Sequence, residues 1–130
     1  MASYLKTIPS AHSVEATIAR IERALAERGI KVFARIDQAA EAAAVGLQMQ
    51  PTVLLVFGNP RAGTPIMVAY PTAALDLPLK ALAWQDADGK TWLGYNDVGL
   101  LAERHGVPLA DLAALAKVDG LLEAAAVGPA

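Results

Sequence analysis

The segment from Gly58 to Thr64 (GNPRAGT) contains the residue types closest to a ligand-binding loop in this sequence. It lies between an apolar run and a helical stretch, and its two glycines are spaced as in a phosphate-binding loop. The lysine of that loop is missing, and Pro60 lacks a backbone N–H that would hold a phosphate. We therefore predict no nucleoside triphosphatase. The weaker hypothesis is an anion site formed by Arg61 and Thr64 and shaped by Asn59. The alternative is a rigid turn whose polar side chains bond only to their own backbone.

Asp76 and Lys80 form a second group of candidate residues, on either side of Leu77–Leu79. This carboxylate and amine could transfer protons at the mouth of a pocket if both were desolvated, because burial or a nearby charge shifts a pKa. The plainer alternative is an ion pair that fixes the chain before the next strand. Tyr95 is expected to line the wall of the same pocket, beside Asp76 and Lys80.

The remaining titratable residues indicate structural roles. His12 and His105 are far apart in a chain without cysteine, so we predict no metal or cofactor and expect both histidines at the surface or at helix ends. Asp37 and Asp97 are expected to cap helices, with general-base catalysis by Asp37 as the alternative. The segment Asp86–Gly89 is typical of a hairpin turn rather than a calcium loop. No catalytic residue can be assigned.

The composition indicates one globular domain over residues 1–130. The chain has 11 lysines and arginines against 13 aspartates and glutamates, with 55% hydrophobic residues. The net charge of −2 argues against nucleic acid or an anionic membrane as a partner. The longest strictly apolar run, Val53–Phe57, is far shorter than the roughly 20 residues of a membrane-spanning helix. The N-terminal residues lack the pattern of a secretory signal, so we expect a cytoplasmic protein.

Apolar spacing and turn residues predict the elements that position these side chains. Strands are expected over residues 4–8, 31–37, 52–58, 79–85 and 91–95. Helices are expected over residues 14–28, 38–45, 65–70, 98–105 and 108–126. The helix at 65–70 would be capped by Thr64 and would begin at Pro65.

Two strands allow more specific predictions. The continuous apolar run Thr52–Gly58 predicts an interior strand that is covered on both faces. In the strand at residues 31–37, Arg35 is expected on the solvent side, with Val32 and Ile36 facing the core. Because the last two strands form a hairpin, the sheet cannot be entirely parallel. The chain is therefore predicted to be an α+β protein.

Several motifs in order resemble one known family. They are GNPxxGT, DLPLK, W-x-D-x-x-G-x-TW and YND, and they follow the segment HSVEATIARIERALAERGIKVFARID. Over about residues 4 to 105 the chain resembles the bacterial domain of unknown function 302 family. The resemblance implies a TATA-binding-protein-like α+β fold, an antiparallel sheet of about five strands with helices mainly on one face, and a homodimer. It implies no established reaction. Many relatives place histidine after the aspartate of the second strand, where this chain has Asp37 and Gln38.

The sequence thus favours a small cytoplasmic homodimer that binds a small ligand, with an anion as the first candidate. One rival is an enzyme that uses Asp76 with Lys80, or Asp37, in acid–base chemistry on a small metabolite. Another is a purely structural interaction protein whose hairpin aromatics, Trp84 and Trp92, form the dimer. The identity of the ligand stays open.

Overall fold

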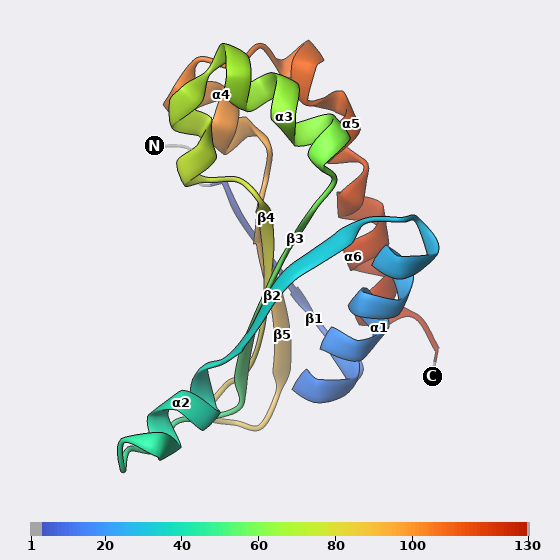
Figure 1. Cartoon of the computed structure of the whole chain (residues 1–130). Coiled ribbons are helices and arrows are strands. Elements are labelled where there is room, and N and C mark those ends of the chain that lie inside the picture. Colours follow the sequence, from blue (N-terminus) through green and yellow to red (C-terminus); the bar gives the residue numbers. More distant parts are fainter. Residues whose placement is uncertain (1–3, 130) are drawn as a thin grey trace.

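The computed structural model describes residues 4–129, which form a five-stranded sheet with helices at its ends and on one face (Figure 1). The strands are β1 (Leu5–Pro9), β2 (Lys31–Asp37), β3 (Thr52–Gly58), β4 (Leu79–Gln85) and β5 (Thr91–Asn96). The α-helices are α1 (Val14–Glu27), α2 (Gln38–Ala44), α3 (Pro60–Ala69), α4 (Gly99–His105), α5 (Ala113–Ala116) and α6 (Val118–Val127). Two 3₁₀ helices are η1 (Pro71–Leu75) and η2 (Leu109–Leu112).

The sheet has the strand order β1-β5-β4-β3-β2, and every neighbouring pair is antiparallel. This arrangement confirms the predicted α+β class and the interior position of β3. The hairpin between β4 and β5 turns at Gly89, whose φ of 83° is the left-handed conformation that glycine adopts readily. The Asp86 side chain accepts hydrogen bonds from the backbone N–H groups of Asp88 and Lys90, which fixes the turn.

The main core lies between the sheet and the helices α1 and α6. Ser13 caps α1 by accepting a hydrogen bond from the backbone N–H of Ala16, at 3.1 Å. The helix then presents Ile18, Ile21 and Leu25 to the sheet, because residues three and four apart lie on one helix face. All three side chains are fully buried.

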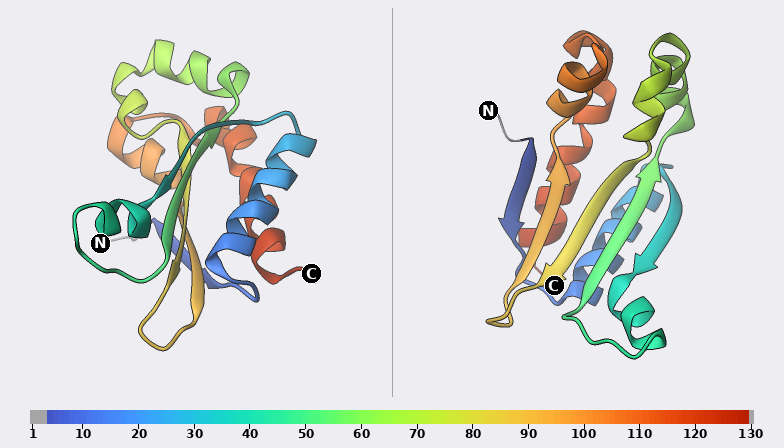
Figure 2. Two further views of the ribbon diagram at one scale, coloured as in Figure 1. Left: turned by 60° about the horizontal axis from the view of Figure 1, so that its bottom comes forward. Right: turned by 90° about the vertical axis from the view of Figure 1, so that its left-hand side faces the viewer.

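The prediction that β3 is covered on both faces is wrong. Val53, Leu55 and Phe57 are buried under the helices, whereas Leu54 and Val56 point to the other face and are half-buried. Figure 2 shows that α1 and α6 lie behind the sheet and that no helix crosses its opposite face. Antiparallel connections can return at the ends of strands, so nothing in the topology requires helices on both faces.

The assignment of faces in β2 is right for Val32, which packs against the main core, and wrong for Arg35 and Ile36, because a bulge interrupts the pairing between Val32 and Ala34. The extra residue reverses the faces of the positions that follow it. Arg35 therefore lies on the helix side, where it donates a hydrogen bond to Glu22 at 2.9 Å and pairs with Glu15. Ile36 lies on the opposite face and is 36% exposed.

The helix after β3 begins earlier than predicted. Asn59 caps α3 by accepting a hydrogen bond from the backbone N–H of Arg61, and Pro60 occupies the first helical position. Pro65, predicted to open the helix, lies inside it. Two Asn/Thr–Pro pairs occur in this segment, and either could start a helix. The structure uses the first pair, which follows directly from β3.

The predicted helix over residues 108–126 is divided into η2, α5 and α6. Its two halves pack on different cores. Leu112 and Leu115 join a second apolar cluster with Ile66 of α3, whereas Leu121 and Leu122 join the main core. Lys117, between α5 and α6, keeps helical dihedral angles, φ −61° and ψ −21°, so the two halves reach different clusters through their different positions along the segment. The second cluster covers one end of the sheet, and the cavities described next lie around it.

Candidate functional site

Three cavities lie at the α3 and α4 end of the sheet, and the six predicted site residues do not line the same one. Asp76, Lys80 and Tyr95 line a cavity of about 210 Å³, which we call the acidic cavity because Asp97 and Asp119 also line it. Thr64 lines an apolar cavity of about 290 Å³, together with Phe33, Met67, Pro78 and other residues. Asn59 lines the apolar cavity and a third cavity of about 450 Å³. Arg61 lines none of the three.

The acidic cavity is bounded by an internal polar network. Tyr95 lies on the helix side of β5, is 5% exposed, and donates a hydrogen bond to Glu123 of α6 at 3.3 Å. Burial of its side chain raises the pKa of Tyr95 to about 12. On the neighbouring edge strand, Lys6 forms ion pairs with Asp97 at 3.1 Å and with Asp119 at 3.3 Å.

Asp97 is held as a carboxylate by two partners. It accepts a hydrogen bond from the backbone N–H of Gly99 at 2.7 Å, and this bond and the one from Lys6 lower its pKa. The predicted capping role is thus close to the observed one, since Gly99 begins α4. Because Lys6 already pairs with both Asp97 and Asp119, this network is typical of a structural brace that ties β1 and β5 to α6.

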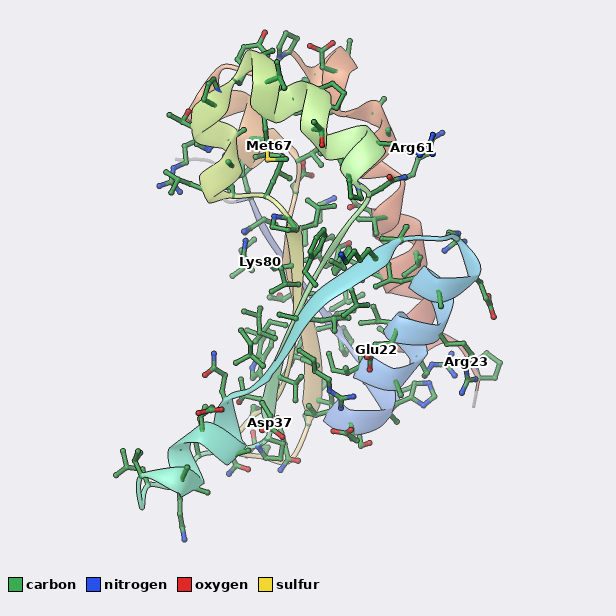
Figure 3. All side chains as sticks on the ribbon, viewed as in Figure 1. Glu22, Arg23, Asp37, Arg61, Met67 and Lys80 are labelled. Carbon is green, nitrogen blue, oxygen red and sulfur yellow. The ribbon has the colours of Figure 1, made fainter. Side chains whose placement is uncertain are left out.

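Asp76 and Lys80 form neither the predicted proton-transfer couple nor the alternative ion pair. Asp76 accepts from His105 Nε2 at 2.5 Å and lies 3.4 Å from the Arg104 guanidinium. Lys80 Nζ donates to the carbonyl oxygen of Pro78 at 3.1 Å. Lys80 precedes the buried Ala81 in β4, so its side chain leaves the sheet on the face away from Tyr95. Figure 3 shows it pointing away from α1.

His105 lies at a helix end, one of the two positions expected for it, because it is the last residue of α4, but it is not at the surface. The His105 side chain is 3% exposed and lies between Asp76 and Thr72, whose Oγ1 is 2.9 Å from His105 Nδ1. Asp76 precedes His105 by 29 positions, so no local spacing in the sequence indicated this contact. A hydroxyl, an imidazole and a carboxylate in series can activate a nucleophile. However, neither Thr72 nor His105 lines any of the three cavities, so the group serves to join α4 to η1.

The loop after β3 is organised as the predicted rigid turn around Asn59. The backbone N–H of Arg61 donates a hydrogen bond to the Asn59 side chain at 2.9 Å. Figure 3 shows the Arg61 side chain projecting outward from the start of α3, away from Lys80. Gly58 allows a close approach, because a Cβ there would lie 3.4 Å from Pro78 Cβ. Arg61, Thr64 and free amides are therefore not assembled into one anion site.

The third cavity combines an apolar floor with two cations, and we call it the basic cavity. Ile30, Phe57, Leu79 and other apolar residues form its floor, and Arg28 and Lys117 are its charged lining residues. No aspartate or glutamate lines it. Within residues 4–129, neither Arg28 nor Lys117 takes part in an ion pair. Sequence patterns did not indicate this site, because Arg28 ends the first helix region and Lys117 lies inside the predicted last helix.

Comparison with known proteins places the chain in a family. The model of the domain of unknown function DUF302 matches residues 6–125. The chain belongs to the DUF302 family. This confirms the resemblance found in the sequence motifs. A crystal structure of an uncharacterized conserved DUF302 protein from Bacillus stearothermophilus superposes with a TM-score of 0.80, at 23% identity and over 96% of this chain and 97% of that chain. The DUF302 fold is therefore shared across a large sequence distance.

Curated relatives of this DUF302 chain carry a functional name. This chain is 46% identical over 119 residues to fluoride-specific ion channel FluC 1 of Brucella suis biovar 1. The matched region covers 91% of this chain and 47% of that protein. The protein of the same name from Brucella abortus biovar 1 matches equally well over 44% of its length. The chain thus spans about half the length of these relatives. In the described part of the DUF302 chain, no helix has the length and apolar character needed to cross a membrane.

Proposed function

We propose that this DUF302 chain is a homodimeric module that binds a small amphipathic anion, a carboxylate on an apolar body, in the basic cavity. One observation carries the proposal. Arg28 and Lys117, neither of them ion-paired within residues 4–129, lie on an apolar cavity of about 450 Å³ that no acidic residue lines. An apolar floor with a few convergent polar groups is the usual composition of a small-molecule site.

The chemistry of the lining selects this class of ligand. Burial of the ligand's apolar body against Phe57 and Leu79 supplies affinity, at roughly 25 cal/mol for each Å² removed from water. A carboxylate suits Arg28, since a guanidinium presents two parallel N–H groups to it. The acidic cavity suits an anion poorly, because Asp76, Asp97 and Asp119 line it. Of the six residues predicted to bind the ligand, Asn59 lines the basic cavity.

Titration calorimetry with matched ligands tests the proposal. Aromatic and medium-chain carboxylates should bind, and the amides of the same acids should bind at least about tenfold more weakly, a difference of roughly 1.4 kcal/mol. Arg28→Ala and Lys117→Ala should each weaken carboxylate binding by a similar factor. Lys90→Ala, which removes an exposed cation from the distant hairpin, is the control and should change nothing. Equal binding of acids and amides, or an unchanged Arg28→Ala Lys117→Ala double variant, would refute the proposal.

The rival acid–base enzyme is not supported by the side chains on which it depended. Asp76 and Lys80 bond to different partners, His105 and the carbonyl oxygen of Pro78, and not to each other. Asp37 caps α2 by accepting a hydrogen bond from the backbone N–H of Ala40 at 2.9 Å, as its first interpretation expected.

A second candidate function comes from the relatives named as fluoride channels. Because the chain matches less than half of each, we infer that the DUF302 domain works beside a channel domain and modulates fluoride transport. In this second candidate function, the DUF302 domain would act in the cytoplasm, as the sequence predicted. Deletion of the gene from its host should then lower the fluoride concentration that stops growth, and the intact gene should restore it. Unchanged fluoride tolerance would argue against this role while leaving carboxylate binding untouched.

A further inference from the structure

The face of the sheet that α1 and α6 leave uncovered is mainly apolar, and we call it the open face. Strand pairing places on it Leu5, Thr7, Pro9, Lys31, Ala34, Ile36, Thr52, Leu54, Val56, Gly58, Lys80, Leu82, Trp84, Trp92, Gly94 and Asn96. A sheet face in contact with water normally carries polar side chains. Within residues 4–129, helices therefore cover the apolar run of β3 on one face alone.

Trp84 makes the centre of the open face flat. Its ring lies against Gly94, since a Cβ at that glycine would be 2.9 Å from Trp84 Cζ3 and 3.3 Å from Cη2. Leu5 of the neighbouring strand is also close, since its Cδ1 would lie 3.7 Å from the same Cβ. Side chains that lie along the strands give the broad, level surface on which a second sheet can pack.

Two lysines of the open face lie at its α3 end. Lys80 pairs with Val56 and Lys31 with Gly58, at the α3 end of β3. At the opposite end the charges are mixed: Glu41 of α2 is exposed there, and Lys90 lies over the Trp92 ring, 4.5 Å from its centroid. Two copies related by a two-fold axis that crosses the strands would bring Lys31 and Lys80 of each copy toward the end of the other copy that carries Glu41. An axis along the strands would bring lysines together, which is unfavourable.

The segment of residues 38–51, which we call the α2 arm, supplies a second observation. Its helix has no buried residue, and Val45, Leu47 and Met49 are 74%, 65% and 47% exposed. Figures 1 and 2 show α2 extending past the end of the sheet on the side of the open face. A helix of seven residues is not stable by itself in water, so an arm of this kind requires a surface to pack on.

We propose that the open face packs against the open face of a second copy of this chain, with the two-fold axis across the strands and each α2 arm clasping its partner. The sheet faces alone, about 20 Å in each direction, bury less than the roughly 800 Å² per partner of a stable interface. The two arms supply the remaining area. This inference deepens the homodimer of the proposed function but is independent of the ligand, because the basic cavity lies on the helix side.

Sedimentation velocity over a concentration series tests the interface. The unmodified chain should be a dimer, and Leu82→Glu, in the middle of the open face, should raise the dimer dissociation constant at least tenfold. The arm variant Val45→Asp Leu47→Asp should also weaken the dimer. Leu109→Asp is the matched control, since Leu109 is 65% exposed on η2 and away from both surfaces. Circular dichroism of each variant should be unchanged, because all these side chains reach solvent in a single copy.

A charge exchange tests the direction of the axis. Lys80→Glu should weaken the dimer, and combining it with Glu41→Lys should restore most of the loss. If the unmodified chain is a monomer at every concentration, the proposed interface is wrong. The same holds if the monomeric chain binds a different protein through this face. Full dimerisation of Leu82→Glu would overturn the interface as well. If Lys80→Glu Glu41→Lys dimerises no better than Lys80→Glu alone, the proposed direction of the two-fold axis is wrong. Carboxylate binding by monomeric Leu82→Glu would show that the ligand proposal stands without the dimer.

Discussion

His105 shows how a single side chain joins two segments at the end of the sheet. Its Nε2 lies 2.5 Å from a carboxylate oxygen of Asp76, and its Nδ1 lies 2.9 Å from the Thr72 hydroxyl. The ring is almost fully enclosed, so water does not replace either partner. The contact connects the end of α4 to η1 and thereby fixes one side of the acidic cavity.

We expect His105→Ala to lower the free energy of unfolding by about 1–3 kcal/mol, because it leaves the Asp76 carboxylate without its nearest donor. Urea denaturation measures the change. Arg104→Ala is the control, since the Arg104 side chain is 56% exposed and lies at the longer distance of 3.4 Å. The control should cost less than about 0.5 kcal/mol, as is usual for exposed ion pairs. Equal losses in the two variants would contradict the role given to the imidazole.

Tyr95 should titrate later than an ordinary tyrosine. Its pKa is raised from 10.0 to about 12, mainly by burial, so the folded state keeps the phenol proton after the unfolded chain has lost it. The stabilising effect is complete below pH 10 and is lost as the pH rises to about 12. The ultraviolet absorbance of tyrosinate, measured as the difference between the unmodified chain and Tyr95→Phe, should show this titration. A midpoint near 10 in the difference would contradict the burial of the phenol.

At the scale of elements, α1 and α2 have similar N-caps but different roles. Ser13 and Asp37 each accept a hydrogen bond from a backbone N–H three residues later. The α1 helix buries its apolar face against the sheet, whereas α2 buries no residue. A cap therefore contributes to the global stability of the fold in α1 and to local order in α2.

Removing each cap separates these effects. In the Leu82→Glu background, which we expect to be monomeric, Ser13→Ala should cost about 1 kcal/mol of global stability. Asp37→Ala should change global unfolding by less than about 0.5 kcal/mol, because unfolding of α2 exposes little that was buried. Amide hydrogen exchange should instead accelerate within Gln38–Ala44 alone. A global loss for Asp37→Ala equal to that for Ser13→Ala would show that α2 belongs to the core.

At the scale of the whole molecule, the proposed ligand and the proposed dimer depend on different forces and different sides of the sheet. The ligand is held in part by Arg28 and Lys117, and the dimer mainly by apolar contact across the open face. Salt weakens interactions between solvent-accessible charges much more than it weakens apolar burial. The two associations should therefore respond differently to ionic strength.

Between about 0.01 and 1 M salt the Debye length falls from about 30 to 3 Å, so carboxylate affinity should fall several-fold. The dimer dissociation constant should change by less than about threefold over the same range, since apolar burial is its main term. Calorimetry and sedimentation in the same buffers measure both quantities. A dimer that dissociates in high salt would show that Lys80 and Glu41, rather than the open face, hold it together.

The sequence by itself determined the features that depend on neighbouring residues. The spacing of Val14, Ile18 and Ile21 predicted α1, the turn at Asp86–Gly89 predicted the hairpin, and the run from Thr52 predicted an interior strand. Each of these follows from side-chain periodicity or turn chemistry within a few residues. The antiparallel α+β class followed from their order.

Only the tertiary structure decided which faces are covered and which side chains meet. A one-residue bulge at Phe33 moved Arg35 to the helix side, a change too small to alter the pattern of β2. The pairing of Asp76 with His105 and the meeting of Arg28 with Lys117 at one cavity join distant parts of the chain. Local spacing specifies the direction of a side chain along its own element, whereas its partners depend on how the elements pack.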